Sequence, residues 1–590
     1  MPPKTLARSL LKGEQNDVLR TAPAEYIALV SDSGAESWLN TTHAVCRMTT
    51  ITIVIFSLKD NSMSGVAGVF LLPSSHSQET VYDRLQHMLP KLALRGQAGF
   101  GLAVFMHEKR VQYTKSSQPA RELTTNDYNE QYANFRPRVA IAHIRSPSNR
   151  ERDESDVQPV HNHKDGFRHL TISLDGALVN ADELREELLV QGHSFDGKTD
   201  AELLLKLIER TCQSDYWQHG LPVNHENLFR EIDDRVDGAV SALLLDGEGN
   251  LIAFRNRYGL RPLEFMQTDD GFLLFASENC AFSGLQGKAD EILPGHIKYV
   301  NGKTGVCLDR SVGDARHKTK LCAYETLYLG SPNTSKRQSH LETRYNIGVA
   351  LGKLIAPRLA VEVGSAPFIV SSMPRTGGPY ADGLFASLAE DGAIVRRHEV
   401  VATQFSQRTL VGIISERRSL IDQKYRVAEE DVADSTIIMV DEALIRGDTS
   451  RAVTNMLLSA GAKAVHWVIG SPPIVAPNYY GMGIDTMDEL VFWQIWKALP
   501  SEQRKQSLRF HNIEPQMLRI IESTIAVSID AATITYLPFQ VLVSLLPQGH
   551  DGIDLSPFTF EMPTPAGQKR ANKNLNKLIA DLPFPESAVA

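Results

Sequence analysis

Residues 435–450 read STIIMVDEALIRGDTS, and this stretch decides the fold of the second half of the chain. Its first part is an apolar run typical of a buried strand, and the run ends in two adjacent acids, Asp441 and Glu442. A loop containing Gly447 follows, and the next apolar residues have helical spacing up to Gly461. Residues 464–469 form another apolar run. The stretch therefore predicts a strand, a loop, a helix and a second strand in a parallel sheet.

Such a unit is suited to bind a phosphorylated ligand. Backbone N–H groups and the helix N-terminus lie beyond the carboxyl edge of the sheet, where unpaired donors and the helix dipole both favour an anion. Two carboxylates beside an anion are costly unless they bind hydroxyl groups or a divalent cation, and a phosphorylated sugar offers partners of both kinds. The alternative is that Asp441 and Glu442 form only a solvated strand end.

The α/β pattern continues on both sides of this stretch. Strands alternate with amphipathic helices from about residue 319 to 475, and short β-branched runs mix with helical stretches before residue 310. The chain is helix-rich up to about residue 530, and the composition after Pro563 predicts a solvated tail. We expect four regions: an N-terminal extension or propeptide at 1–63, α/β domains at 64–310 and 311–490, and a C-terminal helical region and tail at 491–590.

Length and composition exclude several classes of protein. A chain of 590 residues predicts two to four domains. The net charge of −9 leaves no positive field to hold a nucleic acid, and no apolar run reaches the roughly 18–20 residues of a membrane span. The five cysteines are widely spaced and include no C-x-x-C pair, which favours a reducing compartment. We therefore expect a cytoplasmic protein without nucleic-acid or membrane partners.

The second half resembles the type I phosphoribosyltransferases, and within them the amidophosphoribosyltransferase family, which uses glutamine and phosphoribosyl diphosphate (PRPP). The resemblance rests on the acidic pair followed by x-x-[IV]-R-G-x-T-S, and on Arg408, Arg417 and Lys424, which have the spacing of that family's mobile active-site loop. It implies that Asp441 and Glu442 hold the ribose hydroxyls and Mg²⁺. The residues implied in PRPP binding are Arg408, Arg417, Lys424, Asp441, Glu442, Arg446, Gly447, Asp448, Thr449 and Ser450.

The first half resembles an N-terminal-nucleophile glutaminase from Ser64 to about Gly295. Short motifs occur in family order, among them RGQ at 95–97, HIR at 143–145, TDAE at 199–202 and RYGLRPL at 257–263. The resemblance implies a glutaminase-type αββα sandwich followed by a phosphoribosyltransferase parallel-sheet domain. It implies that Ser64 is the nucleophile, that Asp175 and Gly176 lie at the oxyanion hole, and that Arg145 and Asp200 bind the carboxylate and the amino group of glutamine.

Several residues depart from the family pattern. The family has an N-terminal cysteine at the position of Ser64, and Ser64 has a free amine only if residues 1–63 are removed. Asp175 replaces an asparagine, so a carboxylate takes the place of an amide donor at the oxyanion hole. These changes predict poor glutamine hydrolysis. In the phosphate loop a hydroxyl is lost at Ala443, and Asp448 replaces a threonine, which places negative charge near the 5′-phosphate.

The loop expected to bind pyrophosphate departs in a similar way. Residues 371–378 read SSMPRTGG, which keeps small residues for backbone contacts but lacks the acid expected before the threonine. An iron–sulfur cluster is not expected, because no cysteine follows Cys322 and Asn478 stands where the family often has one. Cys280 and Cys322 are expected to be packing residues, and His143 a structural one.

Three functions remain open at this stage. The first is phosphoribosyl transfer to ammonia, from glutamine or free, which gives 5-phosphoribosylamine and pyrophosphate as in purine biosynthesis. The second is a catalytically impaired paralogue with a nucleotide-binding or regulatory role. The third is a divergent transferase of specialised metabolism with another amine acceptor. The expected cofactor is Mg²⁺, and the resemblance implies a homo-oligomer.

Overall fold

The computed structural model describes most of the chain after residue 63. The described residues are 64–96, 99–106, 110–117, 120, 136–145, 157–313, 320–331, 339–362, 367–403, 424–546 and 549–580. The expected extension at 1–63, and Arg408 and Arg417, lie outside these residues.

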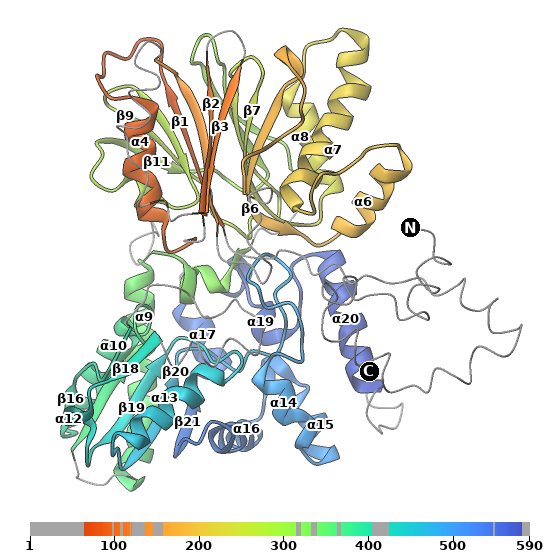
Figure 1. Ribbon diagram of the computed structural model, residues 1–590. Coiled ribbons are helices and arrows are strands. Elements are labelled where there is room, and N and C mark those ends of the chain that lie inside the picture. The colour runs from red at the N-terminus through yellow and green to blue at the C-terminus, as the bar shows by residue number, and fades with distance from the viewer. Residues whose placement is uncertain are drawn as a thin grey trace, which may run out of the picture. The chain divides into compact units, whose positions relative to one another are not determined.

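Two antiparallel sheets form the first half of the described chain (Figure 1). One sheet has the strand order β11-β9-β10-β1-β4-β2-β3, and the other has the order β13-β12-β8-β7-β6-β5. The strands of the first sheet are β1 Ser64–Leu71, β2 Gly99–Phe105, β3 Val111–Ser116, β4 Val139–Arg145, β9 Glu264–Thr268, β10 Phe272–Ala276 and β11 Gly287–Glu291. Those of the second are β5 Val160–His161, β6 Leu170–Leu178, β7 Gly238–Asp246, β8 Leu251–Arg255, β12 His296–Val300 and β13 Cys307–Ser311.

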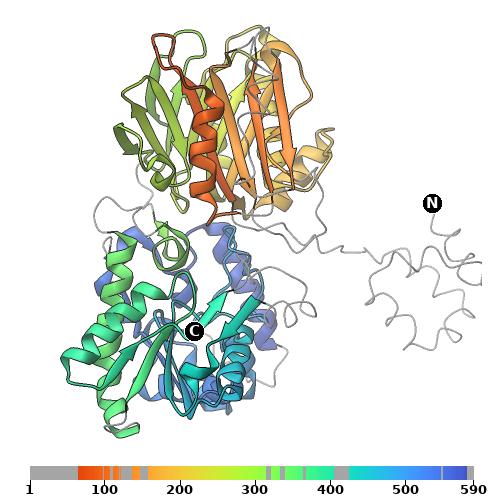
Figure 2. The ribbon, with the colours of Figure 1, turned by 60° about the vertical axis from the view of Figure 1, so that its left-hand side comes forward.

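Helices cover the outer faces of both sheets, as expected for an αββα sandwich. Helix α4 (Val81–Met88) packs on the first sheet, where it forms the red helix of Figure 2. Helices α6 (Ala181–Val190), α7 (Asp200–Asp215) and α8 (His225–Arg235) cover the second sheet. Strand β1 is buried along its whole length because it lies between two cores: Val66 and Phe70 face the second sheet, while Val69 and Leu71 face α4.

A five-stranded parallel sheet forms the second half, in the order β16-β15-β19-β20-β21. Its strands are β15 Phe368–Ser372, β16 Val395–Arg397, β19 Thr436–Asp441, β20 Ala464–Ile469 and β21 Thr533–Tyr536. The helices that accompany it are α9 His340–Glu362, α10 Gly378–Glu390, α13 Asp448–Ser459, α14 Val491–Ala498 and α16 Pro515–Ser528. The predicted strand–loop–helix–strand unit is confirmed as β19, α13 and β20, and the fold class expected for the whole chain is confirmed with it.

The C-terminal region takes a larger part in this fold than its sequence indicated. Strand β21 lies beyond the expected boundary at residue 490 and pairs with β20, so the sheet continues into that region. The prediction of a solvated tail after Pro563 is wrong for α20 (Pro565–Ala580), which buries Ala571 and Leu578. The reason is packing on the 479–480 segment, where Asn574 donates a hydrogen bond to the Tyr479 hydroxyl at 2.9 Å.

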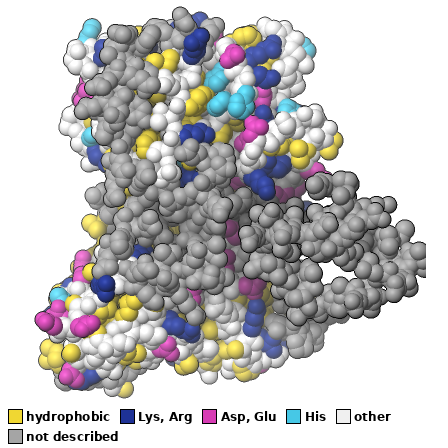
Figure 3. Space-filling view, in the orientation of Figure 1, with side chains coloured by type: hydrophobic (Ala, Val, Ile, Leu, Met, Phe, Trp, Pro, Cys, Tyr) yellow, Lys and Arg dark blue, Asp and Glu magenta, His cyan; other side chains and the backbone are white. Residues whose placement is uncertain are grey.

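Neither positive nor negative charge dominates the described part of the face in Figure 3, where Lys and Arg side chains are interspersed with Asp and Glu side chains. Within the described residues, no helix has both the length and the apolar character needed to cross a bilayer.

Helices α9 and α10 approach each other closely at two glycines. A Cβ atom at Gly348 would lie 2.0 Å from the Tyr380 carbonyl oxygen, and one at Gly383 would lie 2.0 Å from the Tyr345 carbonyl oxygen. We predict that Gly348→Ala forces the helices apart and lowers the free energy of unfolding by about 3 kcal/mol. Chemical denaturation measures this loss. Gly378→Ala is the matched control, since nothing lies within 4 Å of a Cβ there, and equal midpoints for the two variants would contradict the prediction.

Glu522 on α16 gives the second half a pH-dependent stability. Its Oε1 atom accepts a hydrogen bond from the Tyr536 amide at 2.9 Å, and burial raises the pKa of Glu522 to about 7 despite Arg358 and Arg519 nearby. Because the folded state holds this proton more tightly than the unfolded state, the stabilisation is complete below pH ~4.3 and is lost as the pH rises through 7. We predict that Glu522→Gln raises the thermal midpoint by about 2–4 °C at pH 8 and leaves it unchanged at pH 4.5. A scan of the midpoint against pH with no such crossover would reject this assignment.

Candidate active site

A cavity of about 200 Å³ lies at the carboxyl end of β19. The loop from Ala443 to Ser450 and the two acids before it line this cavity, and so does Lys424. The described residues of the set that the sequence implied in PRPP binding are therefore brought together. The loop expected to bind pyrophosphate contributes Met373, Pro374, Arg375 and Thr376 to the wall. Residues that sequence reasoning did not assign to the site complete it: Leu94, Tyr324, Tyr328, Gly330, Arg344 and Tyr425.

The loop turns into helix α13 at Gly447. This residue is the helix N-cap and has φ = 86°, a left-handed conformation that favours glycine. Asp448 is the first residue of the helix, followed by Thr449 and Ser450. The first turn of a helix has amide donors without intrahelical partners, so the loop presents an anion-binding end to the cavity. Asp448 adds a carboxylate at this end.

Asp441, which is half-buried, and Glu442, which is buried, form an acidic pair beside this helix end. The Glu442 amide donates to Asp441 Oδ1 at 3.0 Å, and Glu442 Oε2 is buried without a hydrogen-bond partner. Burial, followed by the neighbouring Glu442 carboxylate, raises the pKa of Asp441. Neither acid forms an ion pair with another described residue. Mg²⁺ usually binds through one or two carboxylates together with substrate phosphates, so this donor set fits Mg²⁺.

The centre of the first half is built around the start of β1. Ser64 is buried and lies opposite Arg145 in the pairing of β1 with β4. Gly176, with φ = 137°, lies on β6, and Asp200 Oδ2 accepts a hydrogen bond from the Leu178 amide at 2.8 Å. The structure thus gathers the residues that the sequence assigned to glutamine binding near one end of the two sheets.

Asp175 has a different environment from the one expected of an oxyanion hole. Its Oδ2 atom accepts hydrogen bonds from Arg95 Nη2 at 2.8 Å and from Ser277 Oγ at 2.9 Å, and the side chain is fully buried. Burial raises the pKa of Asp175, although Arg95 and Arg261 oppose that shift. The carboxylate therefore belongs to an ion pair, where sequence reasoning placed it only as a group that repels an oxyanion.

The comparisons with known proteins cover both halves. A family model described as a glutamine amidotransferase domain matches residues 145–284. The amidophosphoribosyltransferase of Methanocaldococcus jannaschii is 26% identical over 443 residues, which cover 73% of this chain and 88% of the relative. That of Bacillus subtilis is 28% identical over 410 residues, 68% of this chain and 79% of the relative. Both halves of the chain are therefore similar to amidophosphoribosyltransferases.

The solved structures support the same fold. The glutamine PRPP amidotransferase from B. subtilis complexed with ADP and GMP has a TM-score of 0.66 to this chain at 23% identity. It covers 85% of this chain, and 98% of its own chain is matched. The resemblance that the sequence motifs indicated is confirmed by the relatives and by this fold, and the chain departs from the family pattern at Ser64, Asp175 and Asp448.

Arg446 connects the phosphate loop to a neighbouring segment. Its Nε atom donates to Glu489 Oε2 at 2.7 Å, and its Nη2 atom donates to the Gly483 carbonyl at 3.2 Å. The resemblance implied that Arg446 binds PRPP. Arg446 lines the cavity, and its described contacts connect the loop to residues 483–489. No local sequence signal marked Glu489 as its partner.

Other cations line the cavity. Lys424 is only 8% exposed, and Arg375 has φ = 87° in the loop after β15. A positive φ at a residue other than glycine is uncommon and is often found at functional sites. Arg344 Nη2 donates to the Gly330 carbonyl at 2.8 Å. The SSMPRTGG motif could have indicated Arg375, whereas Arg344 lies on a helix with no motif around it.

Cys322 and Asn478 meet in the core of the second half. Asn478 Nδ2 contacts Cys322 Sγ at 3.7 Å, and burial raises the pKa of the Cys322 thiol to about 12. Among the described residues, no group of three or more His, Cys, Asp or Glu side chains could hold a metal ion.

His143 is also buried, which lowers its pKa to about 3 and keeps the ring neutral.

Proposed function

We propose that this protein transfers the phosphoribosyl group of PRPP to ammonia, releasing pyrophosphate and giving 5-phosphoribosylamine. The observation that carries the proposal is the Asp441–Glu442 pair, which lies beside a helix N-terminus in a cavity that cations also line. The names of the relatives support this reaction, since they are amidophosphoribosyltransferases.

The acidic pair would hold the ribose hydroxyls and Mg²⁺. The metal, when bound, would neutralise charge on the diphosphate. Departure of the diphosphate leaves positive charge at the anomeric carbon, and the carboxylates of Asp441 and Glu442 lower the energy of that charge. The loop from Ala443 to Ser450 seats the 5′-phosphate on its amide groups, with Gly447 allowing the turn.

Other residues that line the cavity stabilise the leaving group and exclude water. Lys424 and Arg375 provide positive charge for the departing diphosphate. Leu94, Tyr324 and Tyr328 also line the cavity and limit the access of water, which would otherwise compete with ammonia for the anomeric carbon. Free ammonia, and not glutamine, is the proposed source of nitrogen. The reason is that the carboxylate of Asp175, which is ion-paired with Arg95, cannot donate a hydrogen bond to an oxyanion during glutamine hydrolysis.

The proposal also covers the regions of the chain, its oligomeric state and its compartment. We keep the division into regions at 1–63, 64–310, 311–490 and 491–590, with the sheet of the second half extending through β21. A cytoplasmic homo-oligomer is proposed from the family resemblance.

The impaired-paralogue function is the second candidate, and the carboxylate of Asp448 at the phosphate end of the cavity favours it. Titration calorimetry with PRPP and Mg²⁺ tests both candidates, followed by an assay of pyrophosphate release with ammonium. Binding with release supports the transferase. Binding without release supports the paralogue, and absence of binding rejects both uses of the cavity.

A further inference from the structure

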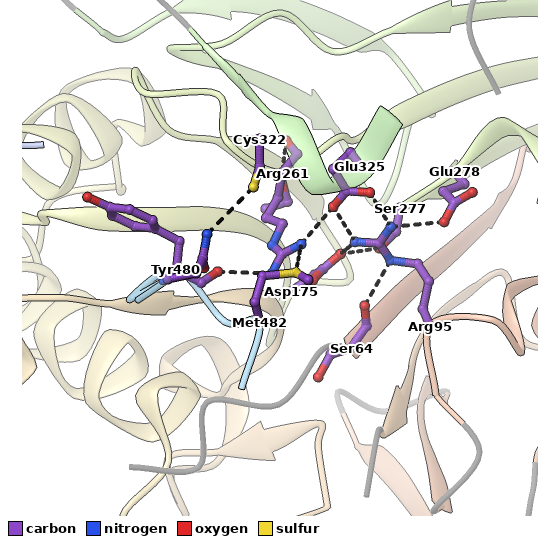
Figure 4. A network of polar contacts seen from close by, with 12 residues as sticks. Ser64, Arg95, Asp175, Arg261, Ser277, Glu278, Cys322, Glu325, Tyr480 and Met482 are labelled. Atoms are coloured by element: carbon purple, nitrogen blue, oxygen red, sulfur yellow. Dashed lines mark hydrogen bonds and ion pairs between the residues drawn. The ribbon is translucent and has the colours of Figure 1, made fainter. Parts of the chain in front are cut away.

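A buried network of ion pairs connects residues of the two halves (Figure 4). Arg95 bonds to Asp175 at 2.8 Å and to Glu325 Oε2 at 2.9 Å, and Arg261 Nη1 bonds to Glu325 Oε1 at 2.7 Å. These four side chains, which we call the clamp, are each at most 2% exposed. Glu278 also bonds to Arg95, at 2.9 Å. At this depth each charge depends on its partners, because water cannot replace them.

One end of the clamp lies at the altered glutaminase centre. Arg95 Nε donates to the Ser64 carbonyl at 3.0 Å while its Nη2 atom holds Asp175. The next residue, Gly176, packs on the second half, since a Cβ atom at Gly481 would lie 3.4 Å from the Gly176 carbonyl carbon. The segment that carries Asp175 is therefore fixed from both sides.

The other end of the clamp lies at the transferase cavity. Glu325 is the first residue of a π-helical turn, Glu325–Leu329, and Tyr324, Tyr328 and Gly330 around that turn line the cavity. Although burial opposes ionisation, Arg95 and Arg261 lower the pKa of Glu325 to about 2, so it is charged at neutral pH. The position of this wall therefore depends on the two arginines that hold Glu325.

We propose that Asp175 is a positioning residue for the transferase cavity. Through Arg95 it fixes Glu325, and through Glu325 it fixes the wall formed by residues 324–330. In this chain a position that the resemblance assigns to glutamine hydrolysis thus serves phosphoribosyl binding instead. The inference rests on the proposed function for its use of PRPP, but its geometric part concerns only the order of this wall.

The physical reason is the cost of an incomplete buried ion pair. Without Asp175, Arg95 Nη2 retains only its 3.1 Å contact with Glu325 among the described acids, and Ser277 Oγ loses its acceptor. Removal of one partner from a buried network leaves polar groups without compensation, and these recruit water or move. Movement of Arg95 shifts Glu325 and loosens the turn that follows it.

The test compares four variants of the full chain. Asp175→Ala removes the carboxylate, Asp175→Asn keeps an acceptor for Arg95, and Glu325→Gln weakens the clamp from its other end. Asp233→Ala is the matched control, because Asp233 is a buried acid of the first half that pairs with Arg257 at 2.7 Å. Hydrogen–deuterium exchange of residues 324–330 and the Kd of PRPP with Mg²⁺ by calorimetry are the two readouts.

We expect Asp175→Ala and Glu325→Gln to speed exchange in residues 324–330 by at least ~10-fold and to raise the Kd of PRPP by ~10-fold. Asp175→Asn should keep both values within ~3-fold of the unaltered protein, and Asp233→Ala should leave both unchanged. Unchanged exchange in Asp175→Ala, or an equal increase in Asp233→Ala, overturns the inference. If the unaltered protein binds no PRPP, the proposed function fails, and exchange alone then supports or rejects the positioning of the wall.

Discussion

The double variant Asp441→Asn/Glu442→Gln loses at least ~10³-fold in kcat/KM for PRPP while the protein becomes more stable. Activity falls because both charges that face the sugar and its metal are removed, and the loss of even one preorganised electrostatic group in an active site costs ~10²–10³ in rate. Stability rises because Glu442 is buried with a carboxylate oxygen that lacks a hydrogen-bond partner, and because neither acid is ion-paired with another described residue.

Pyrophosphate release with ammonium measures the activity of this variant, and thermal unfolding without Mg²⁺ measures its stability. Asp434→Asn is the matched control, since Asp434 is an exposed acid just before the same strand and has φ = 60°, a conformation that asparagine tolerates. We expect the control to retain both properties. Activity within tenfold of the unaltered protein would show that the acidic pair does not serve the chemistry.

Glutamine supports less than ~1% of the rate that ammonium supports at saturation. One reason is that Asp175 supplies a carboxylate where the family places an amide donor, and loss of one oxyanion-hole donor costs ~10²–10³ in kcat. Another reason is that a serine is a weaker nucleophile than a cysteine, and Ser64 has a free amine only after cleavage. The rate with ammonium should rise with pH because the neutral amine is the nucleophile.

The measurement follows glutamate and pyrophosphate in the same reaction. Intact mass of the protein used in the assay shows whether the chain starts at Ser64, so that an uncleaved chain and a cleaved but inactive one are told apart. Formation of glutamate at the same rate as pyrophosphate would contradict the prediction. Absence of pyrophosphate with either nitrogen source, together with PRPP binding, would favour the paralogue.

The sequence by itself determined the parts of this protein that depend on near neighbours. Continuous apolar runs predicted β19 and β20, and helical spacing predicted α13, because each pattern spans fewer than about 20 residues. The acidic pair and the glycine turn are equally local, so the anion-binding loop could be predicted together with its fold. The order of short motifs predicted the family for the same reason.

The tertiary structure alone decided which distant residues meet. Asp175 bonds to Arg95, which is 80 positions away, and Arg95 bonds to Glu325, 230 positions away. No period in the sequence encodes such a contact, so the buried ion pair of Asp175 with Arg95 could not be predicted from residues 175–177. Likewise β21 joins the sheet, and α20 buries one face, through surfaces that other segments supply. Local pattern sets the elements, whereas burial and charge pairing between remote segments set the partners of Asp175 and the wall of the cavity.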